Sequence, residues 1–137
     1  MIRSIVRGKE LSVVVMNEVG ALSRMTSFLV NHGINVDAIA GYSNNVGDQG
    51  ELIFITNNNE DAIAQLVSNG YTDIKEHDVL IVELENRPGA LKNISERLAQ
   101  NNINISFFYC TACPSGCPAK IVLSTTDNSR ALSLLQS

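Results

Sequence analysis

Three cysteines in one short segment are the side chains of this 137-residue sequence best suited to carry chemistry. Cys110, Cys113 and Cys117 lie within eight positions, and a proline follows each of the last two. A zinc or iron–sulfur site on these thiolates would need a fourth ligand, and His32 and His77 lie far away in the sequence. We expect a hairpin loop with free thiols. The alternatives are a redox pair of Cys113 with Cys117 and a metal site on all three cysteines.

The remaining reactive side chains form no catalytic motif. The two histidines stand alone, because His32 follows a predicted helix and His77 lies at a strand junction. The sequence has no glycine-rich phosphate loop, no nucleophile elbow and no metal-ligand helix motif. It therefore predicts that the protein is not an enzyme and carries no cofactor.

Asparagine and glycine form a second pattern, and this pattern occurs twice. The sequence holds 15 asparagines, and a shift of 69 residues brings several of them into register. The shift aligns Asn17 with Asn86, Gly20 with Gly89, Ala21 with Ala90 and Asn35 with Asn104. The register continues without a gap from the 11–22 stretch over 80–91 to Leu66 over Leu135. A fixed offset through strand, turn and helix start indicates two copies of one module.

The turn after the first strand of each copy has the chemistry to bind a small zwitterion. Glycine lets a ligand approach the backbone closely, and the first N–H groups of the following helix suit a carboxylate. The helix dipole adds only about 0.3–1 kcal/mol, so side chains must supply the rest. An asparagine amide both donates and accepts hydrogen bonds. The structural alternative is that Asn17 and Asn86 simply cap these helices.

The elements that position these turns follow from hydrophobic periodicity. Each copy shows a strand, a helix with one apolar face, two further strands and a second helix. The first copy places its strands near 11–16, 35–41 and 51–56, and the second near 80–84, 103–110 and 120–125. In the first copy Asn57–Asn59 can cap the second helix, Gly70 ends it, and a strand near 71–76 follows. This order predicts an α+β fold of two ferredoxin-like βαββαβ modules, each an antiparallel sheet with both helices on one face.

The repeat also sets the expected domain boundaries. The first module covers residues 8–77 and the second covers residues 78–137. The second module has no fourth strand of its own, because its last residue aligns with Ser68. Residues 2–7 precede the first module just as the end of the first precedes the second, with Ile5 over Ile74. We expect the strand at 2–7 to complete the second module.

These turns resemble those of the ACT domain, a regulatory module that binds small effectors. The likeness rests on Asn86-Arg-Pro-Gly-Ala-Leu91 followed by Asn102-Ile-Asn-Ile105. The first copy, 17–24 with 33–36, is similar to the version in acetolactate synthase regulatory subunits, although Glu18-Val19 replaces the common Arg-Pro. The resemblance covers nearly the whole chain as a tandem pair. It implies ligand contacts at Asn17, Gly20, Ala21 and Asn35, and at Asn86, Gly89, Ala90 and Asn104.

The resemblance implies an amino-acid-binding regulatory protein. The effector would lie at the interface of paired ACT-like modules in a homodimer, and its binding would modulate a metabolic enzyme or regulator. One alternative is a regulatory subunit of an acetolactate-synthase-type enzyme. Another is a thiol or metal protein that uses the loop of Cys110, Cys113 and Cys117.

Composition excludes several other classes. A hydrophobic fraction of 45% with a net charge of −4 is typical of a globular protein and not of a disordered one. Ten basic residues against 14 acidic ones argue against a nucleic-acid partner. No apolar run approaches the roughly 18 residues of a membrane span, and the N-terminal residues do not resemble a signal peptide. We therefore expect a cytoplasmic protein without a membrane partner.

Overall fold

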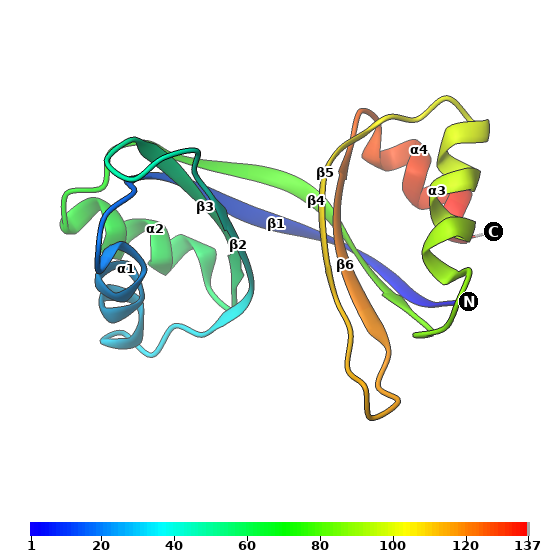
Figure 1. Ribbon diagram of the computed structural model, residues 1–137, viewed down its shortest axis with the longest axis horizontal. Coiled ribbons are helices and arrows are strands. Elements are labelled where there is room, and N and C mark those ends of the chain that lie inside the picture. Colours follow the sequence, from blue (N-terminus) through cyan, green and yellow to red (C-terminus); the bar gives the residue numbers. More distant parts are fainter. Residues whose placement is uncertain (137) are drawn as a thin grey trace. The chain divides into compact units, whose positions relative to one another are not determined.

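The computed structural model describes residues 1–136, which form six strands and four helices. The elements follow one another as β1 (Ile2–Met16), α1 (Ala21–Val30), β2 (Val36–Tyr42), β3 (Gln49–Thr56), α2 (Asn59–Ser68), β4 (Ile74–Leu84), α3 (Ala90–Gln100), β5 (Ile105–Thr111), β6 (Ala119–Thr125) and α4 (Asn128–Gln136). The predicted α+β fold of two ferredoxin-like modules is confirmed (Figure 1). None of the described helices is long and apolar enough to cross a membrane.

The chain divides into two compact units. One unit consists of Lys9–His77, and the other combines Met1–Gly8 with the chain from Asp78 onward. Strands β1 and β4 each contribute one part to either unit, whereas the sequence pattern predicted two short strands in place of each. Gly8 lies within β1 and not in a turn. A Cβ atom at Gly8 would lie 2.7 Å from Cδ1 of Ile81, so a glycine at this position makes room for the Ile81 side chain.

In the unit Lys9–His77, which we call the first unit, helices α1 and α2 cover one face of an antiparallel sheet. Strand β3 pairs with β1 from Leu11↔Phe54 to Met16↔Gln49, and with β2 up to Tyr42↔Glu51. The core consists of alternating strand residues and of one apolar stripe from each helix. Its buried members are Leu11, Val13, Met25, Leu29, Ile34, Phe54, Ala62 and Leu66.

The second unit repeats this arrangement with β4, α3, β5, β6 and α4. Strand β6 pairs with β4 from Leu80↔Leu123 to Leu84↔Ala119. The N-terminal part of β1 belongs to this unit, where Ile2 and Ile5 pack against its core. Strand β1 is hydrogen-bonded to β4, and two further contacts of this segment are the bond from Glu85 N–H to the carbonyl of Met1 at 2.8 Å and the bond from Arg7 to Ser129 at 3.1 Å.

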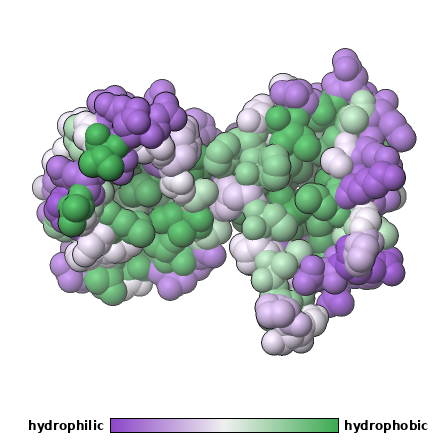
Figure 2. All heavy atoms as spheres, viewed as in Figure 1, coloured by the Kyte–Doolittle hydropathy of each residue, from purple (hydrophilic) through white to green (hydrophobic). Residues whose placement is uncertain are grey.

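Hydrophobic residues also reach the surface of both units, as Figure 2 shows. In the first unit Leu22 of α1 and Ile39 of β2 are exposed. In the second unit the corresponding Leu91 and Phe108 are exposed. These four positions match under the 69-residue repeat, so the two units expose the same side of their fold.

Candidate functional site

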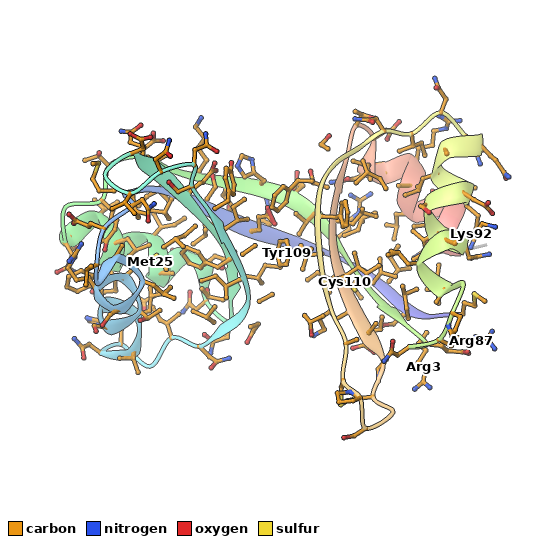
Figure 3. The ribbon with its side chains drawn as sticks, in the orientation of Figure 1. Arg3, Met25, Arg87, Lys92, Tyr109 and Cys110 are labelled. Atoms are coloured by element: carbon orange, nitrogen blue, oxygen red, sulfur yellow. A yellow bond between two sulfur atoms is a disulfide. The ribbon has the colours of Figure 1, made fainter. Side chains whose placement is uncertain are left out.

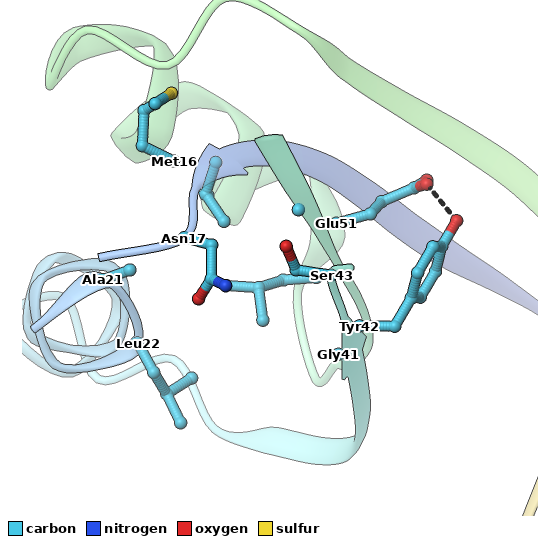
Figure 4. A pocket seen from close by; sticks show the side chains of 11 residues that line it. Met16, Asn17, Ala21, Leu22, Gly41, Tyr42, Ser43 and Glu51 are labelled. Atoms are coloured by element: carbon cyan, nitrogen blue, oxygen red, sulfur yellow. Dashed lines mark hydrogen bonds between the residues drawn. The ribbon is translucent and has the colours of Figure 1, made fainter. Parts of the chain in front are cut away.

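A cavity of about 350 Å³ opens beside the start of α1 in the first unit (Figure 4). It lies between the β1–α1 turn and the ends of β2 and β3 that face this turn. The residues that line it are Val15, Met16, Asn17, Ala21, Leu22, Gly41, Tyr42, Ser43, Gly50, Glu51 and Leu52. Two of the predicted ligand residues, Asn17 and Ala21, are among them.

Asn17 is held in place by its neighbours and presents one free acceptor. Its backbone N–H donates to Asp48 at 2.8 Å, and its carbonyl accepts from Gly47 at 2.8 Å. Its side-chain Nδ2 donates to the carbonyl of Asn45 at 3.0 Å. Within the described chain no hydrogen bond reaches Oδ1, and Figure 4 shows the side chain at the cavity. The amide oxygen is therefore available to a ligand donor.

Gly20 begins α1 in a backbone conformation that other residues rarely adopt. Its φ is 86°, and no side chain caps the helix. The alternative that Asn17 caps α1 is thus wrong. The N–H groups of Leu22 and Ser23 have no hydrogen-bond partner in the described residues. These donors, at the positive end of the helix, suit an anionic group.

The residues that line the cavity include Glu51, which the sequence analysis missed and whose side chain points to the face of the sheet away from α1 (Figure 4). Glu51 of β3 is half-buried, and its Oε2 accepts a 2.6 Å hydrogen bond from the hydroxyl of Tyr42. This bond raises the pKa of Tyr42, and burial and the charge of Glu51 add to the effect. The sequence indicated only that Tyr42 and Glu51 lie on neighbouring strands. That the two side chains meet depends on the β2–β3 register, which the sequence does not give.

Gly41 keeps the cavity open on the face of the sheet that points toward α1. It pairs with Leu52 across β2 and β3. A Cβ atom at Gly41 would lie 2.9 Å from Cδ2 of Leu52, another lining residue. The second unit carries Cys110 at the matching position and Lys120 at the position of Glu51. The corresponding region of the second unit therefore has a different shape and the opposite charge.

Asn35 does not lie at the same site as Asn17. The pairs Met16↔Gln49 and Val36↔Thr56 mark the two ends of β3. At about 3.3 Å per residue, these ends are roughly 23 Å apart. The side chain of Asn35 donates to Asp37 at 2.7 Å, and its backbone N–H donates to Oδ1 of Asn57 at 2.9 Å. A single amino acid in the cavity cannot contact both Asn17 and Asn35 of this unit.

The second unit separates its predicted residues in the same way. Asn86 is exposed, and its Nδ2 donates to the carbonyl of Cys113 at 3.4 Å. Gly89 begins α3 with a φ of 89° and without a side-chain cap, while Ala90 is buried. Asn104 lies at the far end of β5, where its N–H donates to Thr126 at 3.2 Å. Capping by Asn86 is thus wrong as well.

The family follows from a comparison with known proteins. Residues 6–135 match the family described as the ACT domain pair. The chain belongs to this family. No match is found among curated proteins.

The ACT domain pair also has similar solved structures. Protein BT0572 from Bacteroides thetaiotaomicron is 25% identical with a TM-score of 0.87, over 96% of this chain and 88% of that chain. The regulatory subunit of aspartate kinase from Thermus thermophilus, in its ligand-free form, is 12% identical with a TM-score of 0.71, over 98% and 96%. A structure of aspartokinase alpha and beta subunits is 16% identical with a TM-score of 0.69, over 98% and 96%.

The cysteine loop of this ACT domain pair differs from the favoured expectation of three free thiols. Cys113 and Cys117 form a disulfide, and only Cys110 is free. Among the described residues no three histidine, cysteine or acidic side chains come together as a metal site. The two disulfide sulfurs cannot also act as thiolate ligands, so the structure favours the redox alternative over the metal alternative.

The described residues of the ACT domain pair include one hydrogen bond between a serine and a histidine. Ser12 on β1 and Nε2 of His77 on β4 lie 3.1 Å apart. Ser12 is buried, and neither residue lines the cavity of the first unit.

Proposed function

We propose that this ACT domain pair is a regulatory protein that binds a free amino acid in the cavity of its first unit. The observation that carries the proposal is the combination of groups around the cavity. Unpaired N–H donors of Leu22 and Ser23 lie at the start of α1, and the Oδ1 of Asn17 lies at the cavity beside this helix end. An amino acid carries both the anionic group that the donors suit and an ammonium group that the Asn17 oxygen suits.

The apolar lining fits the rest of such a ligand. Val15, Leu22 and Leu52 line the same cavity, and aliphatic walls with a few polar groups are typical of small-molecule sites. A volume of about 350 Å³ lies within the usual range for ligand pockets.

One structural neighbour is a regulatory subunit of aspartate kinase, and this likeness supports a partner enzyme of amino-acid metabolism. We infer that effector binding changes how the protein engages such an enzyme. A coupling of about 1–3 kcal/mol between the effector site and the partner surface is typical for allostery. Assembly into a homodimer is part of the same proposal, and sedimentation equilibrium measures it directly.

Thermal melting with each of the twenty amino acids tests the proposal. A ligand at a hundred times its Kd stabilises the folded state by roughly 2.7 kcal/mol, which gives a clear increase in Tm. Titration calorimetry then gives the affinity and stoichiometry of each hit. We expect one or a few related amino acids to bind. If no amino acid raises the Tm, while a large catalytic chain co-purifies with the protein, the subunit alternative replaces the sensor proposal.

A further inference from the structure

The hairpin between β5 and β6 carries chemistry that the proposed amino-acid site does not use. Its loop is closed by the Cys113–Cys117 disulfide, with the two Cα atoms 5.4 Å apart. Cys110, the third cysteine, lies on β5 before the loop as a free and exposed thiol (Figure 3). The matching loop of the first unit, residues 43–48, contains no cysteine. The first unit therefore serves as an internal comparison for what the disulfide does.

In the first unit, hydrogen bonds fasten the hairpin loop to the strand–helix turn. The backbone of Asn17 donates to Asp48 and accepts from Gly47, each at 2.8 Å. The side chain of Asn17 adds a third bond to Asn45 at 3.0 Å. These bonds fix the loop and the orientation of the Asn17 side chain together.

In the described residues of the second unit, no backbone hydrogen bonds join the strand–helix turn to the hairpin loop. Glu85 N–H donates to Met1, and Arg87 N–H donates to Glu85. In the described residues the only hydrogen bond from this turn to the cysteine loop is the side-chain bond from Asn86 to the Cys113 carbonyl. At 3.4 Å it is longer than a typical N–H···O bond. The disulfide closes the loop on itself and includes Cys113, whose carbonyl accepts the bond from Asn86.

The disulfide is accessible to an external thiol. Cys117 is exposed, whereas Cys113 is half-buried, and exchange depends on access to the sulfur that is attacked. Attack by Cys110 would only exchange one disulfide for another, because a single thiol supplies no net electrons. The reductant must therefore come from outside this hairpin.

We propose that the Cys113–Cys117 bond is a reversible redox site, opened by a dithiol reductant, and that its state controls the orientation of Asn86 at the second strand–helix turn. A thiolate of the dithiol attacks Sγ of Cys117, the S–S bond breaks, and Cys113 leaves as a thiolate that takes up a proton. The second thiol of the reductant then attacks the mixed disulfide and releases Cys117, which is also protonated. Two electrons and two protons pass to the protein, and the dithiol becomes a disulfide.

Reduction has a local consequence. Without the disulfide, nothing in the described loop holds the Cys113 carbonyl opposite Asn86, so the Asn86 amide loses its partner. Asn17 keeps its three hydrogen bonds, because none of them involves a cysteine. Only the second unit thus responds to the thiol–disulfide balance. This inference is independent of amino-acid binding in the first unit.

The test equilibrates the full chain, without denaturant, in buffers with graded ratios of reduced and oxidised dithiothreitol. Alkylation followed by mass spectrometry counts the thiols, and nitrogen-15 NMR follows the side-chain amides of Asn86 and Asn17. We expect the count to rise from one thiol to three in a single two-electron transition. The Asn86 amide signals shift in parallel with this transition, while those of Asn17 stay in place.

Two variants sharpen the test. Cys110→Ser removes the third thiol and leaves the transition and the Asn86 shift intact. The double variant Cys113→Ser/Cys117→Ser shows the reduced-state position of the Asn86 signals in every buffer, with circular dichroism as the check on folding. The proposal is overturned if the bond stays closed in a large excess of reduced dithiothreitol. It is also overturned if the bond opens without moving Asn86, or if opening unfolds the whole unit.

Discussion

Tyr42 and Glu51 face one another across the β2–β3 pair, with the phenol hydroxyl 2.6 Å from Oε2 of the carboxylate. Both residues line the cavity of the first unit. The bond joins a neutral donor to an anion on the sheet face that points away from α1, and it raises the pKa of Tyr42. The phenol therefore reports the electrostatics of this face of the sheet.

We expect Glu51→Ala to lower the pKa of Tyr42 toward its ordinary value of about 10. The variant removes both the acceptor of the Tyr42 hydrogen bond, which is the largest cause of the raised pKa, and the charge that opposes phenolate formation. Because the folded-state pKa is raised, the stability linked to Tyr42 is present below pH 10 or so and is lost as the pH rises through the folded-state pKa. NMR titration of the Tyr42 ring separates it from Tyr71, whose pKa burial also raises. An unchanged Tyr42 titration in Glu51→Ala would contradict the assigned cause.

Asn17→Ala tests the ligand role of the turn asparagine. A hydrogen bond to a charged group contributes about 1.5–3 kcal/mol, so we expect the Kd for the bound amino acid to rise roughly 10- to 100-fold. Calorimetry with the amino acid found by thermal screening measures this change. Asn35→Ala is the matched control, since Asn35 lies at the other end of β3. Equal losses of affinity in the two variants would show that the cavity is not the binding site.

Gly41→Val tests the cavity itself. The backbone of Gly41 is not left-handed, so valine fits the strand, but its Cβ approaches Leu52 and its methyl groups occupy the cavity. We expect binding to fall below detection in calorimetry while the urea midpoint changes little, because Leu52 is a flexible side chain. Binding that survives in Gly41→Val would place the amino acid elsewhere.

Asn59 and Asn128 form the same structural device in the two units. In each unit the amide oxygen accepts from the backbone and hydroxyl of the threonine three residues before, and Nδ2 donates across to β1 or β4 at 3.0 Å. Replacing either asparagine by alanine removes three bonds, which we expect to cost about 2–4 kcal/mol at roughly 1 kcal/mol each. Urea unfolding measures the loss. Asn69→Ala, which removes one exposed bond, is the control and should cost about 1 kcal/mol or less.

Deletion of residues 1–7 tests the part of β1 that lies in the second unit. It removes Ile2 and Ile5 from the core, together with the Arg7–Ser129 and Met1–Glu85 bonds. We expect hydrogen exchange to speed up in β4 from Asp78 to Leu84 and in β6, while β2 and β3 keep their protection. Uniform protection across the deleted protein would show that this strand does not stabilise the second unit.

Short-range hydrophobic patterns in the sequence were enough to predict the order of the helices and strands. Apolar positions such as Leu11 and Val13, or Leu80 and Val82, alternate because a strand buries one face of its side chains. The helix faces at Met25 and Leu29 follow the helical period for the same reason. Gly8 shows the limit of such patterns, because a glycine between apolar runs resembles a turn. Its role in making room for Ile81 depends on a residue 73 positions away.

The sequence by itself determined the duplicated α+β fold, the ACT family resemblance and the place of Asn17 at a strand–helix turn, because these depend on short-range periodicity and on an internal repeat. Only the tertiary structure decided that Asn35 lies far from Asn17, that Tyr42 bonds Glu51, and that Cys113 pairs with Cys117 rather than staying free. Each of these facts depends on strand register or on the path of a loop. Such long-range geometry is set by packing of the whole unit, which no local spacing of residues encodes.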